Sequence, residues 1–179
     1  MKNILKKENT ILIVIDIQEK FLSVIKNINP VIENTLKLIR SFQIMKIAII
    51  VTEQYPKGLG KTVGKIQKEL KSYRPIKKAY FNCFDEKNFK IPKKIKNLII
   101  CGIESHVCVT QTALAAIEKG FNVYLVKDAI SSRKESDYKI ALERAKQEGA
   151  LIASTEMIIF QLLKKAGTKK FKEVIKLIK

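Results

Sequence analysis

The sequence predicts an α/β fold in which helices flank a parallel central sheet. Short, continuous apolar runs rich in β-branched residues alternate with stretches of helical periodicity, and such runs are typical of strands covered on both faces. The connections between them are short, so we expect right-handed crossovers between parallel strands. No Pro- or Gly-rich linker and no internal repeat divides the chain, which favours a single domain over residues 1–179.

Five apolar runs are the expected strands, and the first ends at Asp16. A further short extended segment is expected around Lys78, in the sequence RPIKKAYFNCF. The carboxyl ends of parallel strands are where ligands bind in open sheets, so residues just after each run are candidate site residues. The five runs are Thr10–Ile15, Ile47–Val51, Leu98–Cys101, Val123–Val126 and Leu151–Ala153.

Five stretches show helical periodicity. Gly120 and Gly149 are expected stop signals, and Ser132 with Glu135 fits a capping box that opens the third helix. The fifth helix carries an apolar stripe that could pack either on the core or on a partner subunit. The five predicted helices are Pro30–Met45, Val107–Lys119, Lys134–Gln147, Thr155–Lys165 and Lys169–Ile178.

Composition excludes several classes of protein. The chain has 179 residues, of which 46% are hydrophobic and 29% charged, a balance typical of a folded globular domain. No apolar run approaches the roughly 20 residues that a membrane helix needs, so no membrane partner is expected. The N-terminus does not resemble a secretory signal, and three cysteines are too few for a disulfide framework. We therefore expect a cytoplasmic protein with reduced thiols.

The formal net charge of +18 raises the question of a nucleic-acid partner. Four of the 35 basic residues are Arg and 31 are Lys, and the lysines are spread along the chain. Because Arg reads phosphates and bases better than Lys does, we interpret the charge as a solvated lysine coat with no specific nucleic acid. Binding to nucleic acid or to an anionic surface stays a third alternative, tested by its salt dependence.

The segment YPKGLGKT superficially resembles a phosphate-binding P-loop. That motif needs a glycine five residues before the glycine of its Gly-Lys pair, and Tyr55 stands there. The chain also has no G-x-G-x-x-G motif, so no nucleotide cofactor is expected.

Three reactive side chains stand at or near predicted strand ends: Asp16, Lys78 and Cys108. A thiol in the first turn of a helix, next to an ammonium, should have a lowered pKa, and a carboxylate nearby could accept its proton. This combination predicts a thiolate nucleophile at neutral pH. If the chain turns sharply over Gly102–Ser105, the backbone N–H groups of Glu104 and Cys108 could converge on an oxyanion.

These residues lie in segments that resemble the isochorismatase-like cysteine hydrolases, the superfamily that includes nicotinamidases and N-carbamoylsarcosine amidases. The resemblance implies a three-layer α/β/α, Rossmann-like fold with a mostly parallel sheet. It also implies a catalytic triad of Asp16, Lys78 and Cys108, and a cis peptide bond between Ile103 and Glu104 that aims the Glu104 N–H at the oxyanion. The matching segments are LIVIDIQEKF, VTEQYPKGLG, KAYFNCF, CGIESHVCVTQTALAAIEKGFNVYLVKDAISSR and STEMIIFQLL.

The sequence departs from the family pattern where it bears on chemistry. Nicotinamidase-type members carry an Asp and His cluster for a metal after the second strand, but here that stretch reads TEQYPKG. The only histidine is His106, so a His-rich metal site is impossible within one chain, and we expect no metal or other cofactor. Because the chain keeps Cys108, amide-type chemistry is favoured over vinyl-ether cleavage.

The resulting prediction is a metal-independent cysteine hydrolase that cleaves a C–N or related bond of a small molecule through a thioester. The alternative is a catalytically idle interaction protein with the same fold. Family members commonly form oligomers, so a homo-oligomer is expected. Candidate pocket residues, each of which could instead have a structural role, are Gln18, Phe21, Tyr55 and His106.

The two other cysteines and the loop after the fourth apolar run are expected to have mainly structural roles. Cys101 stands on an apolar run and is expected in the core, whereas Cys83 could line the pocket or pack under a loop. Asp128 and Ser131 are expected to tie down the loop that precedes the capped helix.

Overall fold

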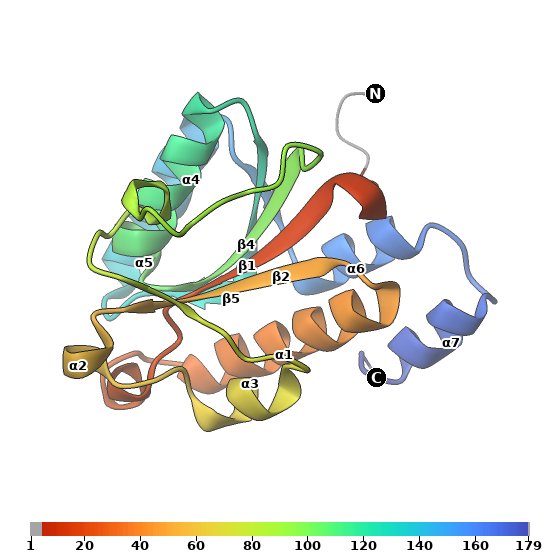
Figure 1. Cartoon of the computed structure of the whole chain (residues 1–179), viewed down its shortest axis with the longest axis horizontal. Helices are drawn as coiled ribbons and strands as arrows, with labels where there is room; N and C mark the ends of the chain where they lie inside the picture. The colour runs from red at the N-terminus through yellow and green to blue at the C-terminus, as the bar shows by residue number, and fades with distance from the viewer. Residues whose placement is uncertain (1–4, 179) are drawn as a thin grey trace.

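The computed structural model describes residues 5–178 and contains one six-stranded sheet in the order β3-β2-β1-β4-β5-β6 (Figure 1). Every pair of neighbouring strands in it is parallel. The predicted α/β fold with helices on both sheet faces is therefore confirmed. The strands are β1 (Thr10–Ile15), β2 (Ala48–Gln54), β3 (Ile76–Lys78), β4 (Asn97–Ile103), β5 (Asn122–Ser131) and β6 (Leu151–Ala153).

Two layers of helices enclose the sheet, with α4 and α5 on one side and α1, α3, α6 and α7 on the other (Figure 1). Their bounds are α1 (Ile28–Met45), α2 (Pro56–Leu59), α3 (Gly64–Glu69), α4 (Thr110–Glu118), α5 (Glu135–Gln147), α6 (Thr155–Leu163) and α7 (Lys169–Ile175). No helix within residues 5–178 is long and apolar enough to cross a membrane.

Strand β1 shows why the apolar runs are continuous. Leu12 and Val14 lie in the core beneath α1 and α6, whereas Ile11, Ile13 and Ile15 lie in the core beneath α4 and α5. Side chains alternate between the two faces of a strand, and both faces of this strand are covered. All six residues of β1 are buried as a result.

The helix starts differ from the sequence predictions. The prediction of a capping box at Ser132 is wrong, because α5 begins at Glu135 and no side chain within residues 5–178 caps it. The Ser132 hydroxyl instead lies 2.9 Å from Nδ1 of His106. Ser132 is buried, and its hydroxyl makes this tertiary contact. Helix α4 begins at Thr110, three residues later than predicted, because a π turn over Ser105–Val109 precedes it.

Strand β5 is longer than predicted, and the structure shows where helix α7 packs. β5 continues five residues past Val126, although exposed Lys127 and Asp128 interrupt its apolar run. Asp128 therefore lies in a strand, and its carboxylate accepts bonds from Thr155 at the start of α6. Helix α7 packs on the core through buried Val174, which answers the open question about the last predicted helix.

The strand order places a crevice at one point of the sheet. The chain moves outward from β1 to β2 and β3 on one side, and from β4 to β5 and β6 on the other. The connections after β1 and β4 therefore diverge at the carboxyl ends of these two central strands, which is where open α/β sheets bind ligands.

Candidate active site

Asp16 directly follows β1 and is completely buried. Its backbone has a left-handed φ of 52°, a conformation that side-chain-bearing residues adopt rarely. Thr52 on the neighbouring strand holds Asp16 in this conformation. The backbone O of Thr52 accepts from the Asp16 N–H at 3.3 Å, and the Thr52 Oγ1 donates to Asp16 Oδ1 at 2.7 Å. The second carboxylate oxygen, Oδ2, is thereby directed elsewhere.

Lys78 ends the short edge strand β3 and supplies the cation that Asp16 faces. Its Nζ lies 2.7 Å from Asp16 Oδ2, and the side chains are 0% and 1% exposed. The ammonium also lies 3.3 Å from the backbone O of Tyr80 and 3.4 Å from that of Phe81. Lys77, the adjacent lysine, is exposed, so the register of β3 decides which of the two enters the site.

Gln54 joins the ammonium to the thiol. It lies in the stretch Thr52–Tyr55 after the second predicted run, where site residues were expected, but the sequence assigned it no role. Its Oε1 accepts from Lys78 Nζ at 2.6 Å and lies 4.0 Å from Cys108 Sγ. Its Nε2 donates to the backbone O of Ala79 at 2.8 Å, which fixes the orientation of the amide. Gln54 follows Thr52 by two positions on β2, so the period-2 rule for strands could have placed both on the face of Asp16.

Cys108 lies in the π turn Ser105–Val109 between β4 and α4. Within this turn the carbonyl of Glu104 accepts from the N–H groups of Val107, at 3.1 Å, and Val109, at 3.2 Å. Neither bond uses the intervening N–H of Cys108. π turns are frequent at functional sites, where they shift a side chain out of regular helical register.

The peptide bond between Ile103 and Glu104 is cis. The Glu104 side chain is 6% exposed, and its carboxylate is held by Arg133. The Arg133 backbone N–H donates to Oε2 at 3.0 Å, and its Nε lies 2.9 Å from Oε1 and 3.1 Å from Oε2. This ion pair was also missed, because sequence reasoning assigned importance to the backbone of Glu104 rather than to its carboxylate.

A cavity of about 240 Å³ opens onto these groups. This volume is slightly below the roughly 300–1,000 Å³ of sites for drug-sized ligands, so it suits a small metabolite. The cavity brings together the carboxylate, the thiol and mainly apolar walls. Its lining consists of Asp16, Phe21, Gln54, Leu59, Phe81, Glu104, Val107, Cys108 and Arg133.

Residues 10–157 match the Isochorismatase domain family. The chain belongs to the isochorismatase family. Isochorismatase family protein 1B of Dictyostelium discoideum is 40% identical over 96% of this chain and 87% of its own length. Isochorismatase domain-containing protein 2A of Mus musculus is 34% identical, over 96% of this chain and 84% of its own length. Membership of this family supports a hydrolase-type function.

Two solved structures have the same fold as this chain. The MAR1 ribonuclease from Caenorhabditis elegans superposes with a TM-score of 0.89 at 41% identity, covering 97% of this chain and 91% of the other. YcaC from Escherichia coli, described as an octameric hydrolase of unknown specificity, superposes with a TM-score of 0.84 at 25% identity, covering 97% and 86%.

The four candidate pocket residues of this isochorismatase-family chain have different locations. Phe21 lines the cavity, whereas the other three lie outside its lining as the structure describes it. Gln18 is buried and braces Gln54, accepting from its backbone N–H at 2.8 Å. Tyr55 is 59% exposed. His106 belongs to the π turn, and its Nδ1 lies 2.9 Å from the hydroxyl oxygen of Ser132.

The two other thiols are buried, as is Cys108. Cys101 lies in the core, as predicted. Cys83, for which two locations were open, is completely buried in the core beneath α4. Burial raises the pKa of Cys83 to about 11 and that of Cys101 to about 12.

The expectation of a thiolate at neutral pH is wrong for the resting site. Burial raises the pKa of Cys108 above its ordinary value, and the negative charge of Asp16 raises it further, against the opposing effect of Lys78. Burial acts to lower the pKa of Lys78, but Asp16 and the nearby thiols raise it overall. The single ammonium is thus already paired with a carboxylate, so the sulfur keeps its proton.

This arrangement predicts the pH dependence of alkylation. We expect iodoacetamide to label Cys108 faster with each pH unit up to at least about pH 9, without a plateau near neutrality, because the reactive thiolate forms only above the ordinary thiol range. In the Asp16→Asn variant the Cys108 thiolate faces the positive charge of Lys78 without the carboxylate, so the pKa of Cys108 should fall. The labelling rate at pH 7 should then rise about threefold for each pH unit by which this pKa falls.

Mass spectrometry of peptides separates the three thiols. Cys83 and Cys101 serve as internal controls, since both are completely buried and should be labelled only after unfolding. A labelling rate for Cys108 that levels off below pH 8 would contradict the protonated resting thiol.

Proposed function

We propose that this chain is a cysteine hydrolase that cleaves an amide-like C–N bond of a small molecule through Asp16, Lys78 and Cys108. The observation that carries the proposal is a single contact set: Lys78 Nζ touches both Asp16 Oδ2 and Gln54 Oε1, and the same Gln54 oxygen lies 4.0 Å from the sulfur of Cys108. A nucleophile and a proton acceptor thus border one cavity, and a fixed cation lies in contact with the acceptor, an arrangement that suits covalent catalysis.

In the first half-reaction, Cys108 Sγ attacks the substrate carbonyl carbon while its proton passes to Asp16. The backbone N–H groups of Glu104 and Cys108 donate to the oxyanion of the tetrahedral intermediate, each worth roughly 3–4 kcal/mol in comparable sites. Asp16 then returns the proton to the leaving nitrogen. The C–N bond breaks, and a thioester and a free amine form.

In the second half-reaction, Asp16 takes a proton from water, and the resulting hydroxide attacks the thioester carbonyl. The C–S bond breaks, the carboxylic acid leaves, and the sulfur recovers the proton. Lys78 stays charged throughout and stabilises the Asp16 carboxylate, while Gln54 is a positioning residue that holds the ammonium between its partners.

The proposal is tested by incubating purified protein with a panel of small amides. After rapid acid quenching, the mass of the intact protein and of its peptides is measured by mass spectrometry. We expect release of the amine and, with a slowly hydrolysed substrate, a mass increase equal to the acyl group on the Cys108 peptide. The Cys108→Ala variant should lose both signals. Full turnover by that variant would rule out the covalent scheme.

The same preparation discriminates two other functions. A catalytically idle interaction protein predicts neither turnover nor an acyl adduct across the whole panel. RNA cleavage is the other candidate, because the solved C. elegans relative is called a ribonuclease and a net charge of +18 would attract the RNA backbone without sequence preference. If the chain cleaves RNA at this site, the wild-type protein degrades RNA at physiological salt and the Cys108→Ala variant does not.

We also propose a cytoplasmic homo-oligomer. All three thiols are unpaired and buried, which suits a reducing compartment. The E. coli relative YcaC is described as octameric, which supports assembly of this chain as well.

A further inference from the structure

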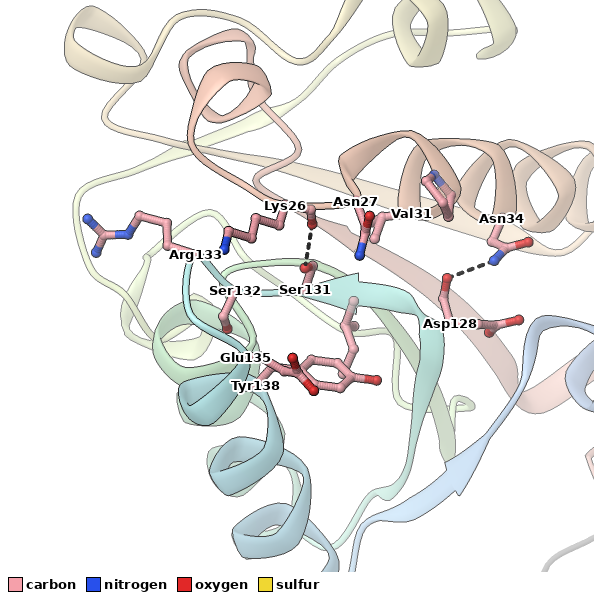
Figure 2. A pocket seen from close by; sticks show the side chains of 12 residues that line it. Lys26, Asn27, Val31, Asn34, Asp128, Ser131, Ser132, Arg133, Glu135 and Tyr138 are labelled. Atoms are coloured by element: carbon pink, nitrogen blue, oxygen red, sulfur yellow. Dashed lines mark hydrogen bonds between the residues drawn. The ribbon is translucent and has the colours of Figure 1, made fainter.

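The catalytic cavity takes part of its wall from short loops. A neighbouring pocket of about 380 Å³, shown in Figure 2, is lined mostly by residues of α1, β5 and α5. The lining of the catalytic cavity instead includes Leu59 of the one-turn helix α2 and Phe21 of the short turn after β1. Short loops have fewer buried contacts than long helices and strands, so they open more easily. The anchors of these loops therefore determine the width of the catalytic cavity.

Leu59 belongs to the connection Tyr55–Thr62 between β2 and α3, which we call the cavity loop. At the start of this loop, the backbone N–H of its first residue donates to the backbone O of Lys78 at 2.9 Å. In its second half, Gln18 Nε2 donates to the backbone O of Gly60 at 2.7 Å. The cavity loop is thus tied to two segments that contribute to the site.

The end of the cavity loop is bound by the carboxylate of Glu53. Thr62, the last residue of the loop, is completely buried, and its N–H and hydroxyl donate to Glu53 Oε1 at 2.7 and 3.1 Å. The hydroxyl of Tyr73 donates to the same oxygen. Burial and this hydrogen bond raise the pKa of Tyr73 to about 12, so its hydroxyl stays protonated near neutral pH. Since Thr62 precedes α3 and Tyr73 follows it, one carboxylate ties both ends of this segment together.

The burial of Glu53 needs a physical reason. The residue is 1% exposed and makes no ion pair within residues 5–178. A carboxylate is costly to bury without a cation unless hydrogen bonds compensate it. All three groups that contact its Oε1 are donors, which matches the acceptor role of an ionised carboxylate. Hydrogen bonds to a charged acceptor are about twice as strong as neutral ones, so the carboxylate holds the loop end firmly.

Glu53 itself does not contact the reacting groups. On β2 it stands between Thr52 and Gln54, whose side chains bind Asp16 and Lys78. Side chains alternate along a strand, so Glu53 points to the other face of the sheet, and it lies outside the lining of the cavity as the structure describes it. Any effect of Glu53 on the site must therefore pass through the segments that it anchors.

We propose that Glu53 is a positioning residue that holds the cavity loop in place and thereby limits the size of the substrate that reaches Cys108. This inference rests on the proposed function, because the substrate is the small amide assigned to Cys108. While the loop is anchored, Leu59 closes one side of a cavity of about 240 Å³. When the anchor is lost, Leu59 can move outward and larger molecules can enter.

The test uses two alkylating probes with the same reactive group and different sizes, iodoacetamide and its N-phenyl derivative. The measured quantity is the ratio of the two labelling rates at Cys108, bulky over small, so a general change in thiol reactivity cancels. We expect a low ratio for the wild-type protein. The Glu53→Ala variant should raise it at least about tenfold. That factor corresponds to about 1.4 kcal/mol, no more than one hydrogen bond to a charged group contributes.

Two variants and the other thiols control for structural damage. Glu53→Gln keeps an oxygen acceptor without the charge and should give an intermediate ratio, even if Glu53→Ala folds poorly. Glu69→Gln removes a carboxylate on α3 that pairs with Arg40 at 2.7 Å, and should leave the ratio unchanged. Labelling of Cys83 and Cys101 reveals unfolded protein. A wild-type ratio in both Glu53 variants would overturn the inference.

A double variant shows whether Glu53 acts through the cavity wall. Leu59→Ala widens the cavity directly and should itself raise the ratio. If Glu53 acts by holding Leu59, the double variant Glu53→Ala, Leu59→Ala should have about the ratio of the higher single variant, because coupled residues are not additive. Effects that multiply would mean that Glu53 acts elsewhere, and would also overturn the inference.

Labelling does not require turnover, so the two proposals can fail separately. A size preference that depends on Glu53, together with no hydrolysis of any amide, supports the positioning role and rejects the hydrolase. Hydrolysis of amides with an unchanged probe ratio in the Glu53 variants supports the hydrolase and rejects the role of Glu53.

Discussion

The free energy of unfolding of the Lys78→Met variant is expected to be about 3–5 kcal/mol lower than that of the wild-type protein. This is the cost of leaving one member of a buried ion pair without its partner. Methionine has nearly the length of lysine and lacks its charge, so the variant isolates the loss of the ammonium. The Asp16 carboxylate, 1% exposed, would then lose the Nζ that lies 2.7 Å away. Urea unfolding followed by circular dichroism measures the change in the free energy of unfolding.

Two companion variants make this prediction specific. Lys77→Met, one residue earlier on β3 and exposed, should change stability by less than about 0.5 kcal/mol. The double variant Asp16→Asn, Lys78→Met removes both charges and should regain most of the lost stability. Equal losses in the Lys77→Met and Lys78→Met variants would mean that burial of the charge pair does not determine the effect.

The Gly102→Ala variant is expected to lose more than about 4 kcal/mol of stability or to fail to fold, a loss found only for severe steric or charge defects. Gly102 has a left-handed φ of 129°, and a Cβ there would lie 2.0 Å from the backbone O of Ile15 on β1. That contact is with backbone of the central strand, so no side-chain movement can relieve it. The melting temperature and soluble yield measure the effect.

Gly64→Ala is the matched control. Gly64 begins α3, has no atom within 4 Å of the added Cβ, and has no left-handed φ. Alanine there should leave stability unchanged or slightly higher, because it restricts the unfolded chain and favours the helix. A Gly102→Ala protein that melts like the Gly64→Ala protein would show that β1 and β4 can separate at this point without cost.

The sheet was predictable from sequence because its strands are covered on both faces. Runs such as Thr10–Ile15 need no knowledge of their partners to be recognised. Predictions failed where polar residues continued a strand, as at Lys127 and Asp128 in β5. The predicted capping box at Ser132 also failed. A capping motif depends on local sequence alone, and here the Ser132 hydroxyl makes a tertiary contact with His106 instead.

The sequence by itself identified the fold class, the family resemblance and the three reactive side chains, because each of these depends on residue type and position along the chain. Only the tertiary structure decided how the charges combine. Gln54 and Arg133 enter the cavity through strand register and loop packing, and the protonation of Cys108 depends on its burial and on a carboxylate 92 positions earlier in the sequence. Electrostatic energies depend on distances through space and on exposure to water, and neither quantity exists until the chain is folded.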